Sequence, residues 1–421
     1  MTTPHIADRS RRDTVAGART LRVRRDEIRR LAPTPFVAAL VILLAIPAMA
    51  LAQPAPPPVL PPGASIAAHG LTNPRGFTWD ADGKLYVALA GVGGAIMATE
   101  PAPIVDALGP FFVGPTAAVV AVVDGCPVPV VAGLPSAANA LAGTYGVADV
   151  AILHDRLYAL FVGGGAVRAN PDVPSGVYAI QDDGTMALVA DLSAWTRANP
   201  TEALPWDYDP ETGGFDMAAG DDRLWISQPN RDEILTVTPD GLVTRIADLS
   251  RGHPVLTGIA LAPDGGVYVG ALTALPFPDG AAKVLHVAED GTVTDAWTGL
   301  TAVTGIAVGP DGILYAAEMA TENLEQPPFF QPGTGKVVRQ TGPASAEEVA
   351  TSLTFPISLA FGPDGNLYVG LPAIGANAGE GVVLRLATAA APAGTPPAPS
   401  ALPAAGPLGS CVPPANGTPS P

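Results

Sequence analysis

The sequence has little charge, few aromatic residues and almost no cysteine. Charged residues make up 14% of its 421 positions, aromatic residues make up 6%, and the two cysteines are Cys126 and Cys411. Because there is no C-x-x-C pair, nothing in the pattern indicates a thiolate zinc site. The sequence also contains no G-x-S-x-G elbow, P-loop or H-E-x-x-H helix, which excludes those routes to hydrolase, nucleotide-binding or protease chemistry.

Basic residues are scarce outside the N-terminus. The net charge is −17 at pH 7, and an acidic surface repels nucleic acid. No basic patch interleaved with aromatic residues follows residue 52. We therefore expect no nucleic-acid partner.

The N-terminal arginines precede an apolar run from Phe36 to Leu51, which ends in small residues up to Ala52. This order predicts a secretory signal over residues 1–52, cleaved after Ala52. The run is shorter than the ~20 residues of a spanning helix. The alternative is an uncleaved anchor, and this segment would then be the only membrane contact. We expect an extracytoplasmic protein, whether secreted, periplasmic or at the cell surface.

Two proline-rich segments flank the remaining chain. Residues 53–63 are predicted to form an extended linker, and residues 388–421, rich in alanine and proline, are predicted to be disordered. Because an exported protein can form disulfides, Cys126 and Cys411 could pair and tie this tail to the body. The alternative is two unpaired thiols.

One hairpin motif recurs six times between these segments. It consists of an apolar strand, a turn and a second strand, and the clear copies are 76–87, 258–269, 305–316 and 358–369. Degenerate copies at 149–159 and 216–226 replace the turn glycine with arginine. In the last three clear copies proline fixes φ at the turn, and in all four glycine takes the positive φ that closes it. A repeat of this spacing predicts an all-β protein, a six-bladed β-propeller with four-stranded blades over residues 64–387. A solenoid of the same hairpins is the alternative.

The last blade is one strand short. Only residues 382–386 follow its hairpin, and residues 65–71 are expected to supply the missing strand and close the ring.

Insertions are expected after the second strands of blades one, five and six, with residues 101–115, 321–334 and 372–380 in long loops. Long loops on one face of a propeller often build its binding site.

The segment Gly70–Gly76, continued through Asp82–Ala88 to Gly91–Gly94, resembles the opening of ScyD/ScyE family proteins. The resemblance covers about residues 64–386. It implies an exported propeller of poorly defined biochemical role, and it supplies no catalytic residues.

Ligands of propellers bind at the mouth of the central channel, near the start of each inner strand. Counting back from the turns brings five side chains to one mouth, and His253 lies just before the inner strand of blade four; the ligand-binding candidates are Arg75, Asp149, Asp216, His253, Thr257 and Thr304. The two carboxylates could hold Ca²⁺ or another divalent ion. They could equally pair with Arg75 in a structural ion cluster, or be solvated. Glu318 is expected to be an exposed loop residue.

Two classes of function remain. The first is an exported binding scaffold without a catalytic set or cofactor, whose partner is a small molecule or an extracytoplasmic protein. The second is a metal-assisted lactonase, hydrolase or lyase of the gluconolactonase-like propeller type. A histidine such as His253 would need a partner residue and a substrate to act as a general base.

Overall fold

The structure is a computed structural model that describes residues 60–98, 110–139, 143–205, 209, 211, 213–375, 378–387 and 411. The predicted signal, most of the linker and all of the C-terminal tail except Cys411 lie outside the described residues. No helix among the described residues is long and apolar enough to cross a membrane.

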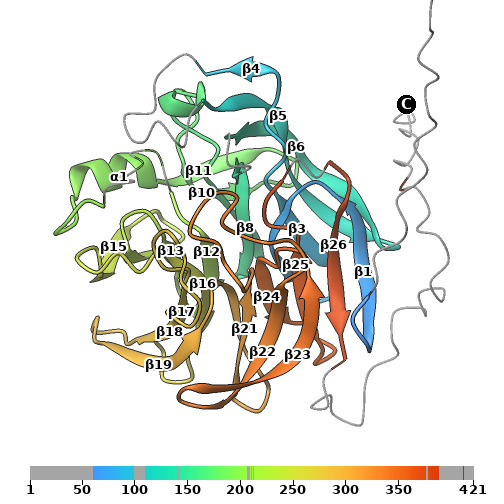
Figure 1. Cartoon of the computed structure of the whole chain (residues 1–421). Helices are drawn as coiled ribbons and strands as arrows, with labels where there is room; N and C mark the ends of the chain where they lie inside the picture. The colour runs from blue at the N-terminus through green and yellow to red at the C-terminus, as the bar shows by residue number, and fades with distance from the viewer. Residues whose placement is uncertain are drawn as a thin grey trace, which may run out of the picture. The chain divides into compact units, whose positions relative to one another are not determined.

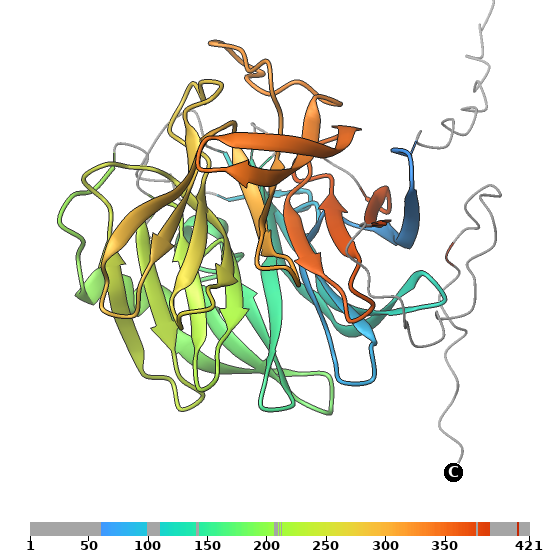
Figure 2. The same cartoon turned by 90° about the horizontal axis from the view of Figure 1, so that it is seen from below.

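Six antiparallel sheets form a six-bladed propeller, which confirms the predicted fold (Figures 1 and 2). The inner strands of successive blades contact one another around the ring, and the sixth contacts the first; they are β2 (Pro74–Trp79), β8 (Val147–Leu153), β12 (Asp216–Ala219), β16 (Leu256–Leu261), β20 (Val303–Val308) and β24 (Ser358–Phe361). The apolar core lies between the blades, where the side chains of adjoining sheets interdigitate.

The outer strands of the first three blades follow their inner strands in order. Blade one adds β3 (Leu85–Leu89), β4 (Ile96–Met97), β5 (Phe112–Val123), β6 (Cys126–Ala138) and β7 (Thr144–Tyr145). Blade two adds β9 (Arg156–Phe161), β10 (Gly176–Ile180) and β11 (Met186–Asp191). Blade three adds β13 (Leu224–Gln228), β14 (Glu233–Val237) and β15 (Val243–Asp248).

The last three blades repeat the same order. Blade four adds β17 (Val267–Ala271), β18 (Ala282–Val287) and β19 (Val293–Leu300). Blade five adds β21 (Leu314–Glu318), β22 (Gly335–Gly342) and β23 (Ser345–Leu353). Blade six adds β25 (Leu367–Leu371), β26 (Gly381–Leu386) and β1 (Ala64–Leu71).

The ring closes as the sequence predicts. Strand β1 pairs antiparallel with β26, from Ala64 opposite Leu386 to Leu71 opposite Gly381. The N-terminal strand thus becomes the outer strand of the blade that the C-terminal end of the fold builds. The tight turns also form as expected, because Gly265, Gly312 and Gly365 adopt φ values of 93°, 77° and 72°.

Blade one differs from the expectation of a long loop. Residues 112–115 belong to β5, and β5 and β6 form a hairpin of 12 and 13 residues around the turn at Asp124 and Gly125. The Asp-Gly pair between valine-rich segments is a hairpin signal that could have predicted it.

The helix α1 (Leu192–Ala198) and the short 3₁₀ helix η1 (Ala166–Arg168) were not predicted. Helix α1 begins where the Asp191 side chain accepts a hydrogen bond from the Ala194 amide at 2.7 Å.

Candidate functional site

The predicted site residues on the inner strands do lie at equivalent positions around the ring. Arg75 lies in β2, Asp149 in β8, Asp216 in β12, Thr257 in β16 and Thr304 in β20. The structure directs the two aspartates and the two threonines towards the neighbouring blade, where each hydrogen-bonds the backbone.

Asp149 and Asp216 bridge blades two, three and four. The Asp149 Oδ2 atom accepts from the Met217 amide at 2.8 Å, and the Asp216 Oδ2 atom accepts from the Ile259 amide at 2.9 Å. The two carboxyl groups also hydrogen-bond each other. Burial raises the pKa of Asp149 well above its usual value, and the charge of Asp216 raises it further. Burial also raises the pKa of Asp216.

Hydroxyl groups form the equivalent contacts in the other blades. Thr257 donates to the Val303 carbonyl at 2.7 Å, and Thr304 donates to the Pro356 carbonyl at 2.8 Å. Ser358 closes the series with a hydrogen bond of 2.8 Å to the carbonyl of Arg75. Together with the two aspartates, these side chains join consecutive blades from blade two round to blade one.

The guanidinium of Arg75 does not join the two aspartates. It donates to both the carbonyl and the hydroxyl of Thr144 at 2.9 Å. Burial lowers the pKa of Arg75 to about 10, and the side chain remains charged at neutral pH. The expected ion cluster of Arg75 with the aspartates is thus absent from the described residues.

The mouth of the ring near the starts of the inner strands is largely apolar. Side chains from blades three, four, five and six pack together there, and the cluster comprises Phe215, Leu272, Ala302, Met319, Phe330, Phe355, Ile357, Ala373 and Ile374. Residues of four blades can meet only near the axis of the ring. The mouth therefore offers little polar surface on that side for a charged ligand.

The aspartate pair does not fit a divalent cation. Each carboxyl group already accepts two backbone hydrogen bonds, and the raised pKa of Asp149 favours its neutral form, whereas a cation would need the carboxylate. Among the described residues no third carboxylate, histidine or cysteine completes a metal cluster with them. The geometry of Asp149 and Asp216 therefore favours a structural role over calcium binding.

Glu318 is buried, contrary to the expected exposed loop position. It ends β21, and its Oε1 atom accepts from the Thr301 amide at 2.6 Å. Its other oxygen lies 3.3 Å from Lys336 Nζ. The buried carboxylate thus anchors the turn between blades four and five.

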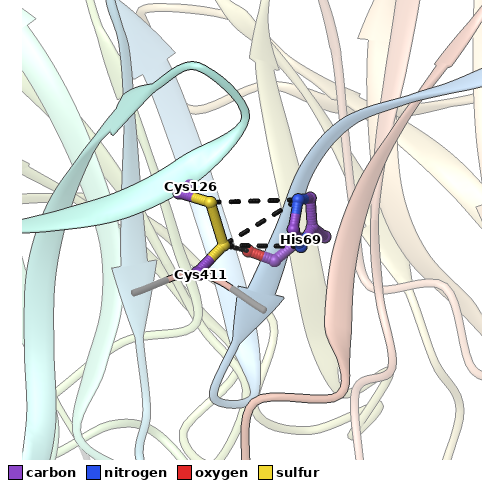
Figure 3. A group of neighbouring side chains, drawn as sticks. All are labelled: His69, Cys126 and Cys411. Carbon is purple, nitrogen blue, oxygen red and sulfur yellow. Dashed lines mark hydrogen bonds between the residues drawn. A yellow bond between two sulfur atoms is a disulfide. The ribbon is translucent and has the colours of Figure 1, made fainter. Parts of the chain in front are cut away.

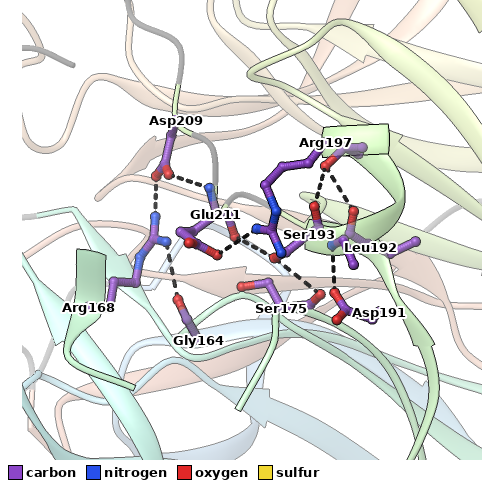
Figure 4. Close-up of polar contacts among 11 residues, drawn as sticks. Gly164, Arg168, Ser175, Asp191, Leu192, Ser193, Arg197, Asp209 and Glu211 are labelled. Carbon is purple, nitrogen blue, oxygen red and sulfur yellow. Dashed lines mark hydrogen bonds and ion pairs between the residues drawn. The ribbon is translucent and has the colours of Figure 1, made fainter. Parts of the chain in front are cut away.

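A second polar cluster lies beside blades two and three (Figure 4). The fully buried Arg168 pairs with Asp209, and its guanidinium lies 4.4 Å from the ring centre of Tyr145. Glu211 lies 3.4 Å from Arg197 of α1. Because these charges pair with one another, the cluster holds its loops together.

His253 is the predicted site residue that forms a histidine–carboxylate pair. It lies in the connection between β15 and β16, and its Nδ1 atom is 2.6 Å from Asp232 Oδ2. The Asp232 side chain is fully buried and that of His253 is 15% exposed. The other oxygen of Asp232 accepts from the Val255 amide at 2.7 Å. Burial raises the pKa of Asp232, and the bond to His253 opposes that rise.

His253 lines a cleft of about 540 Å³ on blade four. One wall is the connection that carries His253, the other is the segment after β17, and the floor is formed by β18 and β19. Apolar side chains dominate the lining, and its polar side chains are His253, Thr273, Lys283 and Asp295. The volume falls in the range of roughly 300–1,000 Å³ that suits small ligands.

Two cleft residues have a positive φ, a backbone conformation that residues other than glycine rarely adopt. His253 has φ 42° and Thr273 has φ 74°. The Thr273 amide donates to the Pro254 carbonyl at 3.0 Å, which joins the two walls. The Thr273 hydroxyl oxygen is buried without a hydrogen-bond partner in the described part of the chain. Strained residues of this kind cluster at functional sites.

Sequence reasoning singled out His253 but expected it near the channel mouth, whereas it lines a cleft floored by the outer strands β18 and β19, and it did not identify Asp232 or Thr273. Asp232 ends the turn between β13 and β14, 21 residues before His253 in the chain. A polar turn at the same end of the preceding blade is the signal that could have identified it.

No protein-family model and no curated protein matches this chain. Solved structures do share its architecture, and the chain has structural neighbours of the gluconolactonase and virginiamycin B lyase type. A putative oxidoreductase (glucose dehydrogenase) from Thermus thermophilus is 14% identical, with a TM-score of 0.50 over 77% of this chain and 99% of that chain.

Two further solved structures are similar at lower TM-scores. A gluconolactonase from Xanthomonas campestris is 12% identical, with a TM-score of 0.47 over 80% of this chain and 99% of that one. The virginiamycin B lyase from Staphylococcus aureus is 15% identical, with a TM-score of 0.43 over 77% and 98%. At such identities the comparisons show the fold alone.

Proposed function

We propose that this chain is an enzyme that opens an ester or lactone bond of a small, largely apolar molecule in the cleft of blade four. His253 is the general base and Asp232 orients it. The observation that carries the proposal is the 2.6 Å contact between His253 Nδ1 and the fully buried Asp232 at the wall of the cleft.

This contact gives His253 the geometry of a general base. A histidine whose Nδ1 atom is held by a buried carboxylate can transfer protons through Nε2, and the carboxylate stabilises the imidazolium that forms. In this structure Nε2 of His253 is shielded from solvent, so the wall of the cleft must open at this point when the substrate binds. A water molecule activated by His253 would attack the carbonyl carbon of the substrate. The proton moves from water to His253, and then to the leaving oxygen when the bond to carbon breaks.

Thr273 supplies the second polar group. Its hydroxyl can donate a hydrogen bond to the carbonyl oxygen, on which negative charge develops during the attack. The proposal needs no metal ion, and it differs in this respect from the metal-assisted mechanism considered from the sequence.

The lining of the cleft defines the class of substrate. Its leucine, proline, alanine and valine side chains favour an apolar body. Lys283 and Asp295 neutralise each other at 2.7 Å, so the floor offers no unpaired charge to an ionic substrate. A neutral ester or lactone with one carbonyl near His253 and Thr273 fits this lining best.

The setting of this activity is proposed from the sequence. The signal at residues 1–52 and the resemblance to ScyD/ScyE proteins support a role outside the cytoplasm. A small molecule, rather than nucleic acid, is the proposed partner.

The test is hydrolysis of a panel of neutral aryl esters and five- and six-membered lactones by the purified full chain. His253→Ala should lower kcat/KM roughly 10²–10⁴-fold, the contribution usual for a general base. Asp232→Asn should lower kcat with a smaller effect on KM, and Thr273→Val should lower kcat without loss of binding.

The matched control is a second histidine–aspartate pair, which lies on blade four. His286 Nε2 lies 2.9 Å from Asp264 Oδ2, and neither residue lines the cleft. His286→Ala should therefore leave activity unchanged. Equal activity in the His253 and His286 variants would overturn the proposal. Saturable binding of panel members without turnover would refute catalysis and favour the scaffold role.

A further inference from the structure

The Cys126–Cys411 disulfide lies against a histidine (Figure 3). His69 lies in β1, and its amide donates to the Gly125 carbonyl in the turn of the β5–β6 hairpin at 2.9 Å. Cys126 begins β6, directly after that turn. The outer hairpin of blade one thus contacts the closing strand of blade six, and the disulfide joins Cys411 at the same point.

The three side chains form the one potential metal cluster among the described residues. Their ligand atoms all lie within 4.8 Å of one another. His69 Nε2 is 3.9 Å from the sulfur of Cys126 and 3.8 Å from the sulfur of Cys411. One nitrogen is therefore almost equidistant from both sulfurs.

These distances are close to those of a tetrahedral zinc site. With Zn–S bonds of about 2.3 Å and a Zn–N bond of about 2.0–2.1 Å, the nitrogen would lie about 3.6 Å from each sulfur. The two sulfurs would lie about 3.8 Å apart. Only the separation of the two sulfurs, which are covalently bonded in the disulfide, must change substantially. Reduction of the bond removes the covalent link that sets this separation.

We propose that His69, Cys126 and Cys411 form a redox-dependent binding site for a soft or borderline metal ion such as Zn²⁺. A dithiol reductant donates two electrons and two protons to the disulfide and becomes a disulfide itself. The metal ion then displaces the two thiol protons and binds both thiolates and the His69 imidazole. A water molecule completes the four ligands.

The site would fasten Cys411 to the propeller in either redox state. In the oxidised protein the covalent bond holds it, and in the reduced protein the metal ion does. Gly70 permits this approach, because it has φ 72° and an added Cβ would lie 3.3 Å from the Cys411 sulfur. Ring closure itself depends on the pairing of β1 with β26, so reduction should leave the propeller folded.

The test is a titration of tag-free full-length protein with Co²⁺, which reports thiolate ligands by sulfur-to-cobalt absorption. Protein reduced with a phosphine and desalted should bind one Co²⁺ with this absorption, and Zn²⁺ should displace it. Oxidised protein should show no such band. Titration of free thiols confirms the redox state of each sample.

Variants separate the three ligands. His69→Ala should weaken binding to the reduced protein roughly 10–100-fold or more, and Cys126→Ser or Cys411→Ser should remove most of the absorption. His286→Ala is the control and should bind Co²⁺ as the wild-type chain does. Circular dichroism of each variant verifies that the sheet content is intact. Absence of thiolate absorption in reduced wild-type protein, or equal affinity in the His69 and His286 variants, would overturn the proposal.

Discussion

The raised pKa of Asp149 predicts that the stability of the fold depends on pH. Asp149 is 3% exposed, and burial together with the charge of Asp216 raises its pKa well above 3.8. Asparagine at position 149 has the shape of the protonated acid. Its carbonyl oxygen can accept from the Met217 amide and its amide group can donate to Asp216, while only the local bond from the Val150 amide is lost. We therefore expect Asp149→Asn to preserve the bridge between blades two and three.

The sign of the pH effect follows from proton binding. Between pH 3.8 and its raised pKa, Asp149 holds a proton in the folded chain and has lost it in the unfolded chain. Stability from this group is complete below that window and is lost as the pH rises through it. Each pH unit within the window costs about 1.4 kcal/mol. Asparagine cannot ionise. The unfolding free energy of Asp149→Asn should therefore rise relative to that of the wild-type chain by about 1.4 kcal/mol for each pH unit within this window.

The assay is reversible denaturant unfolding of oxidised protein across the acidic to neutral range. Asp149→Ala should be less stable at every pH by about 1–3 kcal/mol, because the Met217 amide loses one of its two acceptors and the buried Asp216 carboxyl group loses its partner. Asp82→Asn, in an exposed turn, controls for the loss of one acid. The reasoning is refuted if the difference between Asp149→Asn and wild type does not change with pH, or if the asparagine and alanine variants are equally unstable.

Three further predictions concern the packing of the ring. Gly76→Ala should destabilise strongly, because its Cβ would lie 1.5 Å from Asp149 Oδ1, and Asp149→Ala should suppress much of that loss in a double-mutant cycle measured by denaturant unfolding. Gly258→Ala should lower Tm with no such rescue, because its Cβ would lie 2.7 Å from the Gly305 Cα atom, which cannot be trimmed. Leu71→Ala, in the closing strand, should cost about 2–5 kcal/mol of unfolding free energy, whereas Leu188→Ala, 48% exposed, should cost little.

The fold could be predicted because its determinants are local. Each Asp-Gly turn and its flanking apolar strands specify a hairpin without reference to the rest of the chain, as at Gly265 and Gly312. The closing strand could also be predicted, because the last blade lacked one strand. Helix α1 was missed because it is one short insertion capped by Asp191, with no repeat to reveal it.

The site was less predictable, because side-chain direction depends on the neighbouring blade. Counting along the repeat places Asp149 and Asp216 correctly on their strands. It does not reveal that the adjacent strand presents the amides of Met217 and Ile259 as donors. Likewise, the chain separates His253 from Asp232 and separates His69 from both cysteines. Only the folded ring brings those groups together.

The irregular copies of the repeat give blade three two junctions of a different kind. Where the repeat has Gly258 and Gly305, an added Cβ would meet the backbone of the next inner strand within 3 Å, so these strands pack directly. Where it has Asp149 and Asp216, a carboxyl group fills the space and bonds the next strand instead. Both edges of blade three are therefore joined through ionisable side chains. The blade with two carboxyl junctions therefore also supplies Asp232, the carboxylate that orients His253 at the cleft of blade four.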